Sequence, residues 1–262
     1  MNSNKQNYTV ITGASSGIGY ATAKAFAQRG SNLVLVARRQ EELQALKQQI
    51  LGQHSSLDII IKATDLSLPE NVYELYADVR NLPLQTWINN AGFGNYASVN
   101  QQNIAKISRL LQLNVEALTI LSSLFVRDFQ NVAQTQLINV SSCGGYTIVP
   151  NAVTYCASKF YVSAFTEGLA WELQQSGAPM RAKVLAPAAT QTEFGKIAND
   201  VSEYDYRKSF TNYHTSAQVA NFLLQLYDSD QVVGLVDRED FSFHLGKPLF
   251  PYAGQSKHNQ KN

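Results

Sequence analysis

The sequence contains few of the residues that build disulfide frameworks or metal sites. It has only two cysteines, Cys143 and Cys156, and four histidines that do not cluster along the chain. The cysteine spacing fits neither a disulfide framework nor a zinc site. We therefore expect two buried, apolar thiols in the reducing environment of the cytoplasm, and no bound metal.

Long apolar runs and an excess of one charge are also absent. No stretch reaches about 18 consecutive apolar residues, and residues 1–8 are polar rather than a basic segment followed by an apolar one. The 21 basic and 20 acidic side chains leave a formal charge of +1. These features predict a cytoplasmic protein that is not exported and binds neither a membrane nor nucleic acid. Its partner is expected to be a small molecule.

What the sequence does contain is an alternation of strand-like and helix-like segments. The expected strands cover 8–11, 33–36, 58–61, 86–88, 136–140, 181–185 and 232–236, and the expected helices cover 18–29, 41–51, 69–80, 102–129, 154–175 and 216–227. Near-continuous apolar strands separated by helices indicate a parallel sheet covered on both faces. We predict an α/β protein with a single Rossmann-like domain over residues 1–254, built on a doubly wound parallel sheet of about seven strands.

Two segments do not follow this alternation. Residues 192–214 contain several aromatic side chains but no clean strand pattern, and we interpret them as a helical lid over the substrate. The polar residues 255–262 are expected to form a disordered tail.

A glycine-rich turn follows the first predicted strand. Gly13, Gly17 and Gly19 have the spacing Gly-x-x-x-Gly-x-Gly, and Ser15, Ser16 and Ile18 lie between them. Glycines allow a tight turn and a close approach of the backbone, while the next helix points its N-terminal amides at an anion. The spacing differs from the usual Gly-x-Gly-x-x-Gly fingerprint, so the place in the chain carries the prediction of a phosphate site.

The second predicted strand ends in two arginines, Arg38 and Arg39. A site that prefers NAD is expected to have an acidic residue here, facing the ribose 2′-hydroxyl. Two guanidinium groups can instead bind a 2′-phosphate through paired hydrogen bonds. The alternative is a solvated basic pair ahead of Glu41 and Glu42.

Four motifs occur together in a recognisable order: the glycine turn, Asn89-Asn90-Ala91-Gly92 after the fourth strand, Ser142, and Tyr155-Cys156-Ala157-Ser158-Lys159. In this combination the chain resembles the classical short-chain dehydrogenase/reductase family. The resemblance implies an NADP(H)-dependent oxidoreductase in which Asn114, Ser142, Tyr155 and Lys159 form the catalytic set.

Tyr155 and Lys159 are four positions apart, so on a helix they project from one face. A free tyrosine has a pKa of about 10, and a nearby ammonium favours the phenolate. We expect Lys159 to lower the pKa of Tyr155 in this way. The resemblance implies that Tyr155 exchanges a proton with the substrate oxygen and that Lys159 also binds the nicotinamide ribose.

The resemblance assigns supporting roles to two other residues. The Ser142 hydroxyl would hydrogen-bond the substrate oxygen, with Ser141 as the competing neighbour and a flexible turn as the alternative interpretation. Asn114 would help to hold a water that leads from Lys159 towards solvent. Because asparagine is unfavourable inside a helix, a local reason for Asn114 is expected.

Further cofactor contacts are implied by the resemblance. Asp65 and Leu66 match a pair that contacts adenine, Asn90, Ala91 and Gly92 match a segment beside the adenine ribose, and Pro187, Thr190 and Thr192 match the segment that receives the nicotinamide carboxamide. The chain departs from the family pattern at Ala188, where a glycine is usual, and at Ser16, where a basic residue is common. Arg38, aided by Arg39, would therefore hold the 2′-phosphate.

The function predicted from these residues is reduction of an apolar ketone or aldehyde by NADPH. Phe93, Tyr96, Cys143, Phe194 and the aromatic residues of the expected lid are candidate pocket walls, although plain packing would equally explain the aromatic residues from Phe194 to Tyr213. A 3-oxoacyl-thioester reductase, a small hydroxy-acid dehydrogenase and a non-catalytic NADP-binding sensor or scaffold remain alternatives. The resemblance also implies a homodimer or homotetramer packed partly through the Tyr155 helix.

Overall fold

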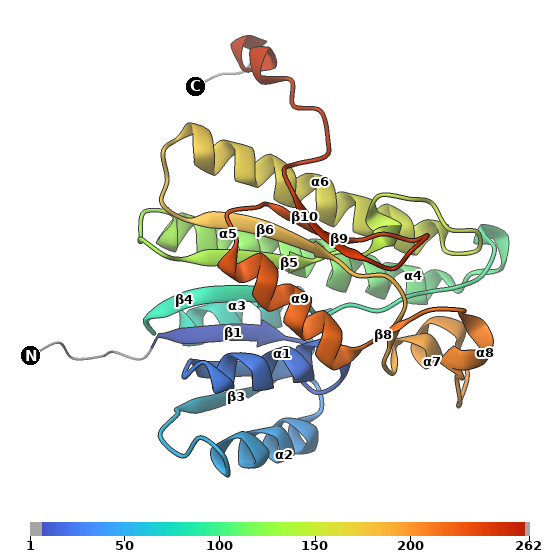
Figure 1. The fold of residues 1–262 in the computed structure, drawn as a ribbon, viewed down its shortest axis with the longest axis horizontal. Helices are drawn as coiled ribbons and strands as arrows, with labels where there is room; N and C mark the ends of the chain where they lie inside the picture. The colour runs from blue at the N-terminus through green and yellow to red at the C-terminus, as the bar shows by residue number, and fades with distance from the viewer. Residues whose placement is uncertain (1–6, 260–262) are drawn as a thin grey trace, which may run out of the picture.

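Eight strands form one central sheet in the computed structural model, which describes residues 7–259 (Figure 1). The sheet has the order β10-β9-β6-β5-β4-β1-β2-β3. Its strands are β1 (Tyr8–Thr12), β2 (Asn32–Ala37), β3 (Ile59–Ala63), β4 (Leu84–Asn89), β5 (Gln136–Val140), β6 (Arg181–Ala186), β9 (Val233–Val236) and β10 (Phe243–Gly246). All neighbouring strands are parallel except β9 and β10, and the predicted fold class is confirmed.

One strand more than expected is present, because β10 was not predicted. It pairs antiparallel with β9, with Phe243 opposite Val236, and it lies at the edge of the sheet. An edge strand has one neighbour and is partly exposed, so its sequence lacks the continuous apolar run of the central strands. His244 and Leu245 at its centre are indeed exposed.

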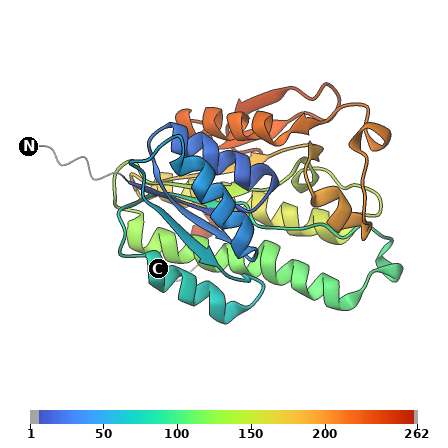
Figure 2. The same ribbon diagram turned by 90° about the horizontal axis from the view of Figure 1, so that it is seen from below.

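Two layers of helices cover the sheet (Figures 1 and 2). One layer contains α1 (Gly17–Gln28), α2 (Gln40–Leu51) and α9 (Ser216–Asp228), and the other contains α3 (Pro69–Val79), α4 (Ile104–Leu111), α5 (Leu118–Phe129) and α6 (Val153–Gln175). A hydrophobic core lies between each helix layer and the sheet, and alternate residues of a strand pack into the two cores. In β2, Leu33 and Leu35 pack with the first layer, whereas Val34 and Val36 pack with the second. The middle of β2 is therefore apolar at successive positions.

The long helix predicted over 102–129 is divided in the structure. A 3-10 turn, η1 (Val99–Gln101), precedes α4, and a π-helical segment, η2 (Gln112–Ala117), separates α4 from α5. By length and composition Ile104–Phe129 could cross a membrane, but core helices of soluble proteins pass the same test. In this fold Leu121 and Phe125 pack into the core beneath the sheet.

The segment expected to be a helical lid contains two short helices, α7 (Phe194–Asn199) and α8 (Tyr206–Ser209). It lies between β7 (Thr190–Gln191) and β8 (His214–Thr215), which pair in parallel as a small second sheet. The Lys106 ammonium on α4 donates to the Asp200 carboxylate at 2.6 Å and to the Ile197 carbonyl at 2.9 Å. These bonds tie α7 to the wall formed by α4.

The C-terminal segment crosses α6 and is held by one buried carboxylate. Glu167 on α6 accepts hydrogen bonds from the backbone amides of Leu249 and Phe250, and from the hydroxyl of Tyr146 after the 3-10 turn η3 (Cys143–Gly145). Of the tail expected to be disordered, residues 255–259 lie in the 3-10 helix η4 (Gly254–Asn259), and residues 260–262 lie outside the described part of the chain.

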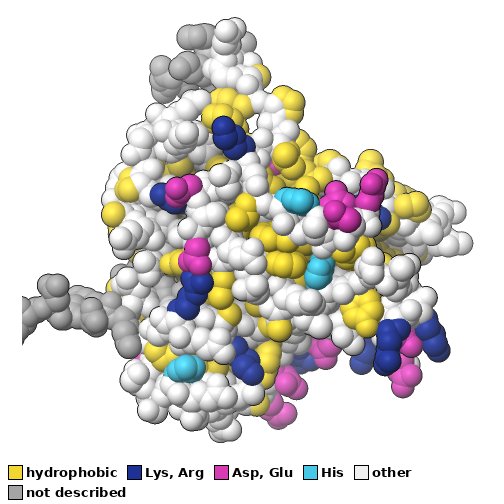
Figure 3. All heavy atoms as spheres, viewed as in Figure 1, with side chains coloured by type: hydrophobic (Ala, Val, Ile, Leu, Met, Phe, Trp, Pro, Cys, Tyr) yellow, Lys and Arg dark blue, Asp and Glu magenta, His cyan; other side chains and the backbone are white. Residues whose placement is uncertain are grey.

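Charged side chains are dispersed over the face seen in Figure 3, where basic and acidic groups occur in small mixed clusters. Among the described residues, ion pairs such as Arg29 with Asp228 and Arg181 with Asp230 bring charges of opposite sign together. This face therefore has no broad patch of one sign.

Candidate active site

The C-terminal ends of the parallel strands open into one large cleft of about 1690 Å³. In open parallel sheets this edge is where ligands bind. Most of the site residues predicted from the sequence line the cleft, from Gly13 after β1 to Thr192 after β6. Gly19 and Asn114 are the two that do not, because each lies one layer behind the surface of the cleft.

The glycine turn needs glycine for two physical reasons. Gly13 and Gly17 have positive φ angles of 69° and 57°, a region that other residues rarely adopt. A Cβ atom on Gly19 would lie 2.3 Å from the Gly13 carbonyl oxygen, and one on Gly13 would lie 2.8 Å from the Asn90 amide nitrogen. Asn90 in turn donates to the Thr12 carbonyl at 2.9 Å, which joins the turn to the loop after β4.

The N-terminus of α1 has the properties of an anion site. Its N-cap residue, Ser16, makes no side-chain capping bond, and no acidic residue lies in the first turn. By contrast, α9 has a complete capping box between Thr215 and Gln218. The first amides of α1 therefore lack a side-chain acceptor and border the cleft, which fits the phosphates of a dinucleotide.

The two arginines after β2 have different surroundings. The Arg39 guanidinium binds the Glu193 carboxylate at 2.8 and 3.2 Å and also contacts the Ser15 hydroxyl. These bonds hold the pKa of Glu193 below its ordinary value. Arg38 lines the same cleft and forms no ion pair within residues 7–259. Arg38 acts electrostatically on the Asp65 carboxylate, whose pKa it helps to lower, but unlike Arg39 it is not engaged in a salt bridge among the described residues.

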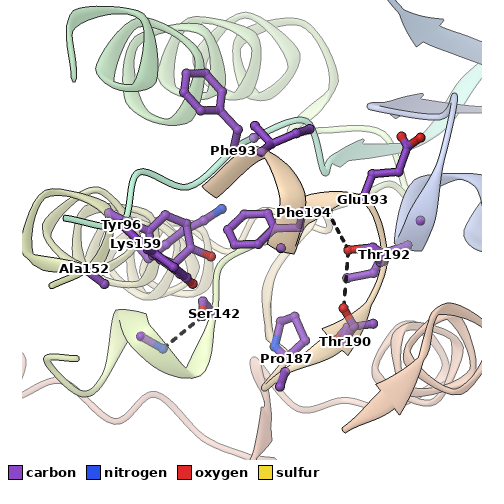
Figure 4. A pocket seen from close by; sticks show the side chains of 18 of the residues that line it. Phe93, Tyr96, Ser142, Ala152, Lys159, Pro187, Thr190, Thr192, Glu193 and Phe194 are labelled. Atoms are coloured by element: carbon purple, nitrogen blue, oxygen red, sulfur yellow. Dashed lines mark hydrogen bonds between the residues drawn. The ribbon is translucent and has the colours of Figure 1, made fainter. Parts of the chain in front are cut away.

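The predicted catalytic residues meet at the inner end of the cleft (Figure 4). Ser142 follows β5, and its hydroxyl accepts from the Gly144 amide at 3.0 Å and hydrogen-bonds Tyr155. Tyr155 and Lys159 lie on one face of α6, and both are buried. The competing Ser141 faces the other way, because its hydroxyl contacts the Lys159 carbonyl and Ser163 within the core.

The expected tuning of Tyr155 by Lys159 is not seen in this structure. Burial raises the pKa of Tyr155 well above that of a free tyrosine, and the hydrogen bond with Ser142 opposes this only in part. The Lys159 ammonium donates to the Val140 carbonyl at 2.9 Å and lies 5.9 Å from the centroid of the Tyr155 ring. Burial lowers the pKa of Lys159 to about 8. Desolvation therefore dominates both groups, and Tyr155 keeps its proton at neutral pH.

Asn114 holds the loop after β4 rather than lining the cleft. Its side-chain oxygen accepts from the Phe93 amide at 3.1 Å, and its nitrogen donates to the Phe93 carbonyl at 3.0 Å and to the Ser158 hydroxyl at 3.2 Å. Asn114 lies in the π-helical segment η2, a feature that often marks functional sites. This pairing with a neighbouring backbone is the local reason for an asparagine within a helix.

The segment after β6 forms the floor of the cleft. The Thr192 hydroxyl accepts from the Phe194 amide at 3.1 Å and donates to the Thr190 carbonyl, as Figure 4 shows. Ala188 does not have a positive φ angle, so the replacement of the family's usual glycine causes no backbone strain. Pro187 accepts from the Cys143 amide at 2.9 Å, which joins this segment to the loop of Ser142.

Several residues of the cleft were not predicted from the sequence. Arg238, Glu239 and Phe241, in the turn between β9 and β10, reach its outer part. Glu193 had no assigned role, although it is the partner of Arg39. Prediction of β10 would have placed Arg238, Glu239 and Phe241 near the cleft. Nothing in the local sequence indicates the contact between Glu193 and Arg39, because these two residues are far apart along the chain.

Comparison with known proteins identifies the fold and its family. A family model described as short chain dehydrogenase matches residues 7–202. The chain is 29% identical over 219 residues to an uncharacterized oxidoreductase of Staphylococcus saprophyticus, covering 83% of this chain and 86% of that protein.

Two solved structures are also similar. One is a short-chain dehydrogenase from Sphingobium yanoikuyae in complex with NADPH, at 29% identity and a TM-score of 0.81, covering 89% of each chain. The other is a bulky-bulky ketone specific alcohol dehydrogenase from Comamonas testosteroni, at 25% identity and a TM-score of 0.76, covering 97% of this chain and 91% of that one. With this fold, these motifs and this match, the chain belongs to the short-chain dehydrogenase/reductase family of oxidoreductases.

Proposed function

We propose that the protein is an NADPH-dependent reductase of ketones or aldehydes in which Tyr155 donates the proton. The observation that carries this proposal is the buried Tyr155 phenol on the helix face that also carries Lys159, in a cleft that it shares with Ser142 and whose other half fits a dinucleotide. A tyrosine that keeps its proton at neutral pH is suited to protonate an alkoxide, which is the proton transfer that carbonyl reduction requires.

The cofactor half of the cleft supports a phosphorylated nicotinamide dinucleotide. The uncapped N-terminus of α1 would receive the pyrophosphate, and Arg38 the 2′-phosphate. The two positions directly after β2 hold arginines rather than an acidic residue that would bind a free ribose 2′-hydroxyl. The similar Sphingobium yanoikuyae enzyme was solved with NADPH, which is consistent with this choice.

The chemistry at the substrate oxygen follows from three side chains. When bound, the reduced nicotinamide supplies a hydride to the carbonyl carbon. The Ser142 and Tyr155 hydroxyls would hydrogen-bond the carbonyl oxygen, where negative charge develops. Tyr155 then gives up its proton to this oxygen, and the alcohol forms. Lys159, cationic below a pH of about 8, stabilises the resulting phenolate and binds the nicotinamide ribose.

The walls around Tyr155 favour an apolar substrate. Tyr155, Ala152 and Cys156 form a small hydrophobic cluster, against which Phe93, Tyr96, Val149 and Phe194 pack. Such a surface suits a neutral ketone or aldehyde with a bulky apolar group. The Comamonas testosteroni relative, described as specific for bulky-bulky ketones, is consistent with this substrate class.

We also propose a cytoplasmic homodimer or homotetramer. Exposed apolar side chains on and beside α6, including Ile148, Val153 and Tyr161, support contact through this helix. Sedimentation of the purified protein would measure the assembly.

A screen of NADPH oxidation against about a hundred ketones, aldehydes and acyl thioesters tests the proposed function. Turnover of apolar ketones or aldehydes is expected, with acyl thioesters reduced more slowly. Binding of NADPH without oxidation on any of these compounds would instead support the non-catalytic sensor or scaffold.

Lys159 leads to a prediction for the pH dependence of cofactor binding. Because burial lowers its pKa to about 8, the ammonium loses its proton above that pH rather than above 10.5. Loss of a charged hydrogen-bond donor to the ribose should weaken NADPH binding by about tenfold between pH ~7 and pH ~9.5. Fluorescence titration of NADPH at each pH measures this effect.

Deprotonation of Lys159 should not lower the stability of the folded protein over the same pH range. A depressed lysine pKa means that the folded state binds fewer protons than the unfolded state between pH values of about 8 and 10.5, so this group makes folding more favourable as the pH rises.

The variant Lys159→Met is the control for the binding experiment, since its NADPH affinity should not vary with pH. The same pH dependence in this variant would contradict the assignment.

A further inference from the structure

A second phenol, that of Tyr96, faces the substrate half of the cleft. Its ring meets the Tyr155 ring edge to face, with centroids 6.0 Å apart, and lies 6.2 Å from the Phe194 ring. Figure 4 shows Tyr96, Ser142 and Phe194 around the same hollow. Tyr96 therefore lies beside the position that the reacting carbonyl would take.

The Tyr96 hydroxyl has no hydrogen-bond partner among the described residues. Buried phenols normally have one, as do Tyr76, which donates to the Leu124 carbonyl, and Tyr146, which donates to Glu167. The Tyr96 oxygen is not sealed in the core, since it is not among the enclosed polar atoms without a partner. It is a donor that a molecule in the cleft can reach.

The surroundings of this hydroxyl place it close to the reacting atoms. Tyr96 packs against the cluster that contains Tyr155 and Cys156. Cys143, Tyr204 and Tyr206 line the same cleft as the two phenols. The two phenols thus converge on one region, and burial raises the pKa of Tyr96, so this side chain stays a neutral donor at physiological pH.

The loop that carries Tyr96 is held firmly. Gln102 receives hydrogen bonds from Asn95 at 3.2 Å and from Thr154, next to Tyr155, at 2.7 Å, and it donates to the Ala97 carbonyl at 2.9 Å. The Tyr96 amide donates to the Ala198 carbonyl of α7 at 2.8 Å. These bonds join the loop to the catalytic helix on one side and to the lid on the other, so the hydroxyl is positioned before a substrate binds.

The charges nearby favour a neutral ligand group. Most charged side chains that line the cleft are balanced by a neighbour of opposite sign: Lys106 pairs with Asp200, Arg109 with Asp65 and Arg39 with Glu193. Arg238 and Glu239, also of opposite sign, are adjacent in the turn after β9. We infer that Tyr96 is a specificity-determining residue whose hydroxyl donates a hydrogen bond to a second, uncharged oxygen of the substrate. The favoured substrates are then ketones that carry a hydroxyl or a second carbonyl close to the reduced carbon.

This inference rests on the proposed function, and matched substrate pairs test it. The rates to compare are kcat/KM for acetophenone and for its α-hydroxy derivative, with phenylpropanedione as a third substrate. Wild-type protein should prefer the two substrates with a second oxygen. In Tyr96→Phe, the ratio of kcat/KM for these two substrates to that for acetophenone should fall by about three- to tenfold, mainly through KM.

The control is Tyr73→Phe, which removes a phenol hydroxyl from the exposed surface of α3 and should change none of the rates. Thermal unfolding of both variants checks that the fold is retained. An equal change on all three substrates, or no change on any, overturns the inference and leaves the proposed function in place. If wild-type protein reduces no ketone at all, the proposed function fails and the inference fails with it.

Discussion

Tyr155→Phe is expected to lower kcat for ketone reduction by at least ~100-fold while the fold and NADPH binding persist, because a positioned proton donor contributes roughly 10²- to 10⁴-fold. The variant removes only the hydroxyl that bonds Ser142. The ring would still pack against Tyr96 and Phe194, at centroid distances of 6.0 and 5.3 Å. Loss of turnover without loss of stability therefore isolates the proton transfer.

Three measurements separate the outcomes for this variant: kcat with the best ketone from the screen, the Kd for NADPH, and the Tm. Tyr161→Phe is a matched control on the same helix, since its hydroxyl contacts Thr119 at the surface and not the cleft. This control should retain wild-type kcat. Turnover in Tyr155→Phe close to that of the wild type would move the proton donor to another group.

Arg38→Asp should lower kcat/KM for NADPH by about 100-fold and leave or raise the value for NADH, so that the preference for NADPH is lost or reversed. A hydrogen bond to a charged group contributes about 1.5–3 kcal/mol, and aspartate would also repel the 2′-phosphate. In place of that contact, the carboxylate can accept from the free ribose 2′-hydroxyl of NADH.

The neighbouring arginine provides the comparison. Arg39 is already paired with Glu193, so Arg39→Gln should reduce NADPH selectivity by only a few-fold. The readout is the ratio of kcat/KM for the two cofactors in wild-type protein and both variants. A wild-type preference for NADH, or a larger effect from Arg39 than from Arg38, would contradict this assignment of the 2′-phosphate.

The expected and observed structures differ mainly where distant segments meet. The central strands were predicted closely, since each is buried on both faces and its apolar run is a local property of the chain. Strand β10 was missed because an exposed edge strand needs no such run. The π-helical segment at Asn114 was also missed, since its cause is the backbone of Phe93, which lies elsewhere in the sequence.

The candidate site shows the same division. The order of the motifs along the sequence indicated the glycine turn, Ser142, Tyr155 and Lys159, and all four reach one cleft. The resemblance already favoured Ser142 over Ser141, and it placed the 2′-phosphate on Arg38 aided by Arg39. Only the tertiary structure shows that the Ser141 hydroxyl lies in the core and that the Arg39 guanidinium is paired with the Glu193 carboxylate.

By itself, the sequence determined the fold class, the glycine-rich turn after the first strand and the spacing that brings Tyr155 and Lys159 to one helix face, because these depend on local periodicity and on residues near each other in the chain. The tertiary structure decided the protonation of that pair and the position of the Tyr96 phenol. Burial acts on an ionisable group through all the atoms that exclude water from it, and those atoms come from segments that only folding brings together.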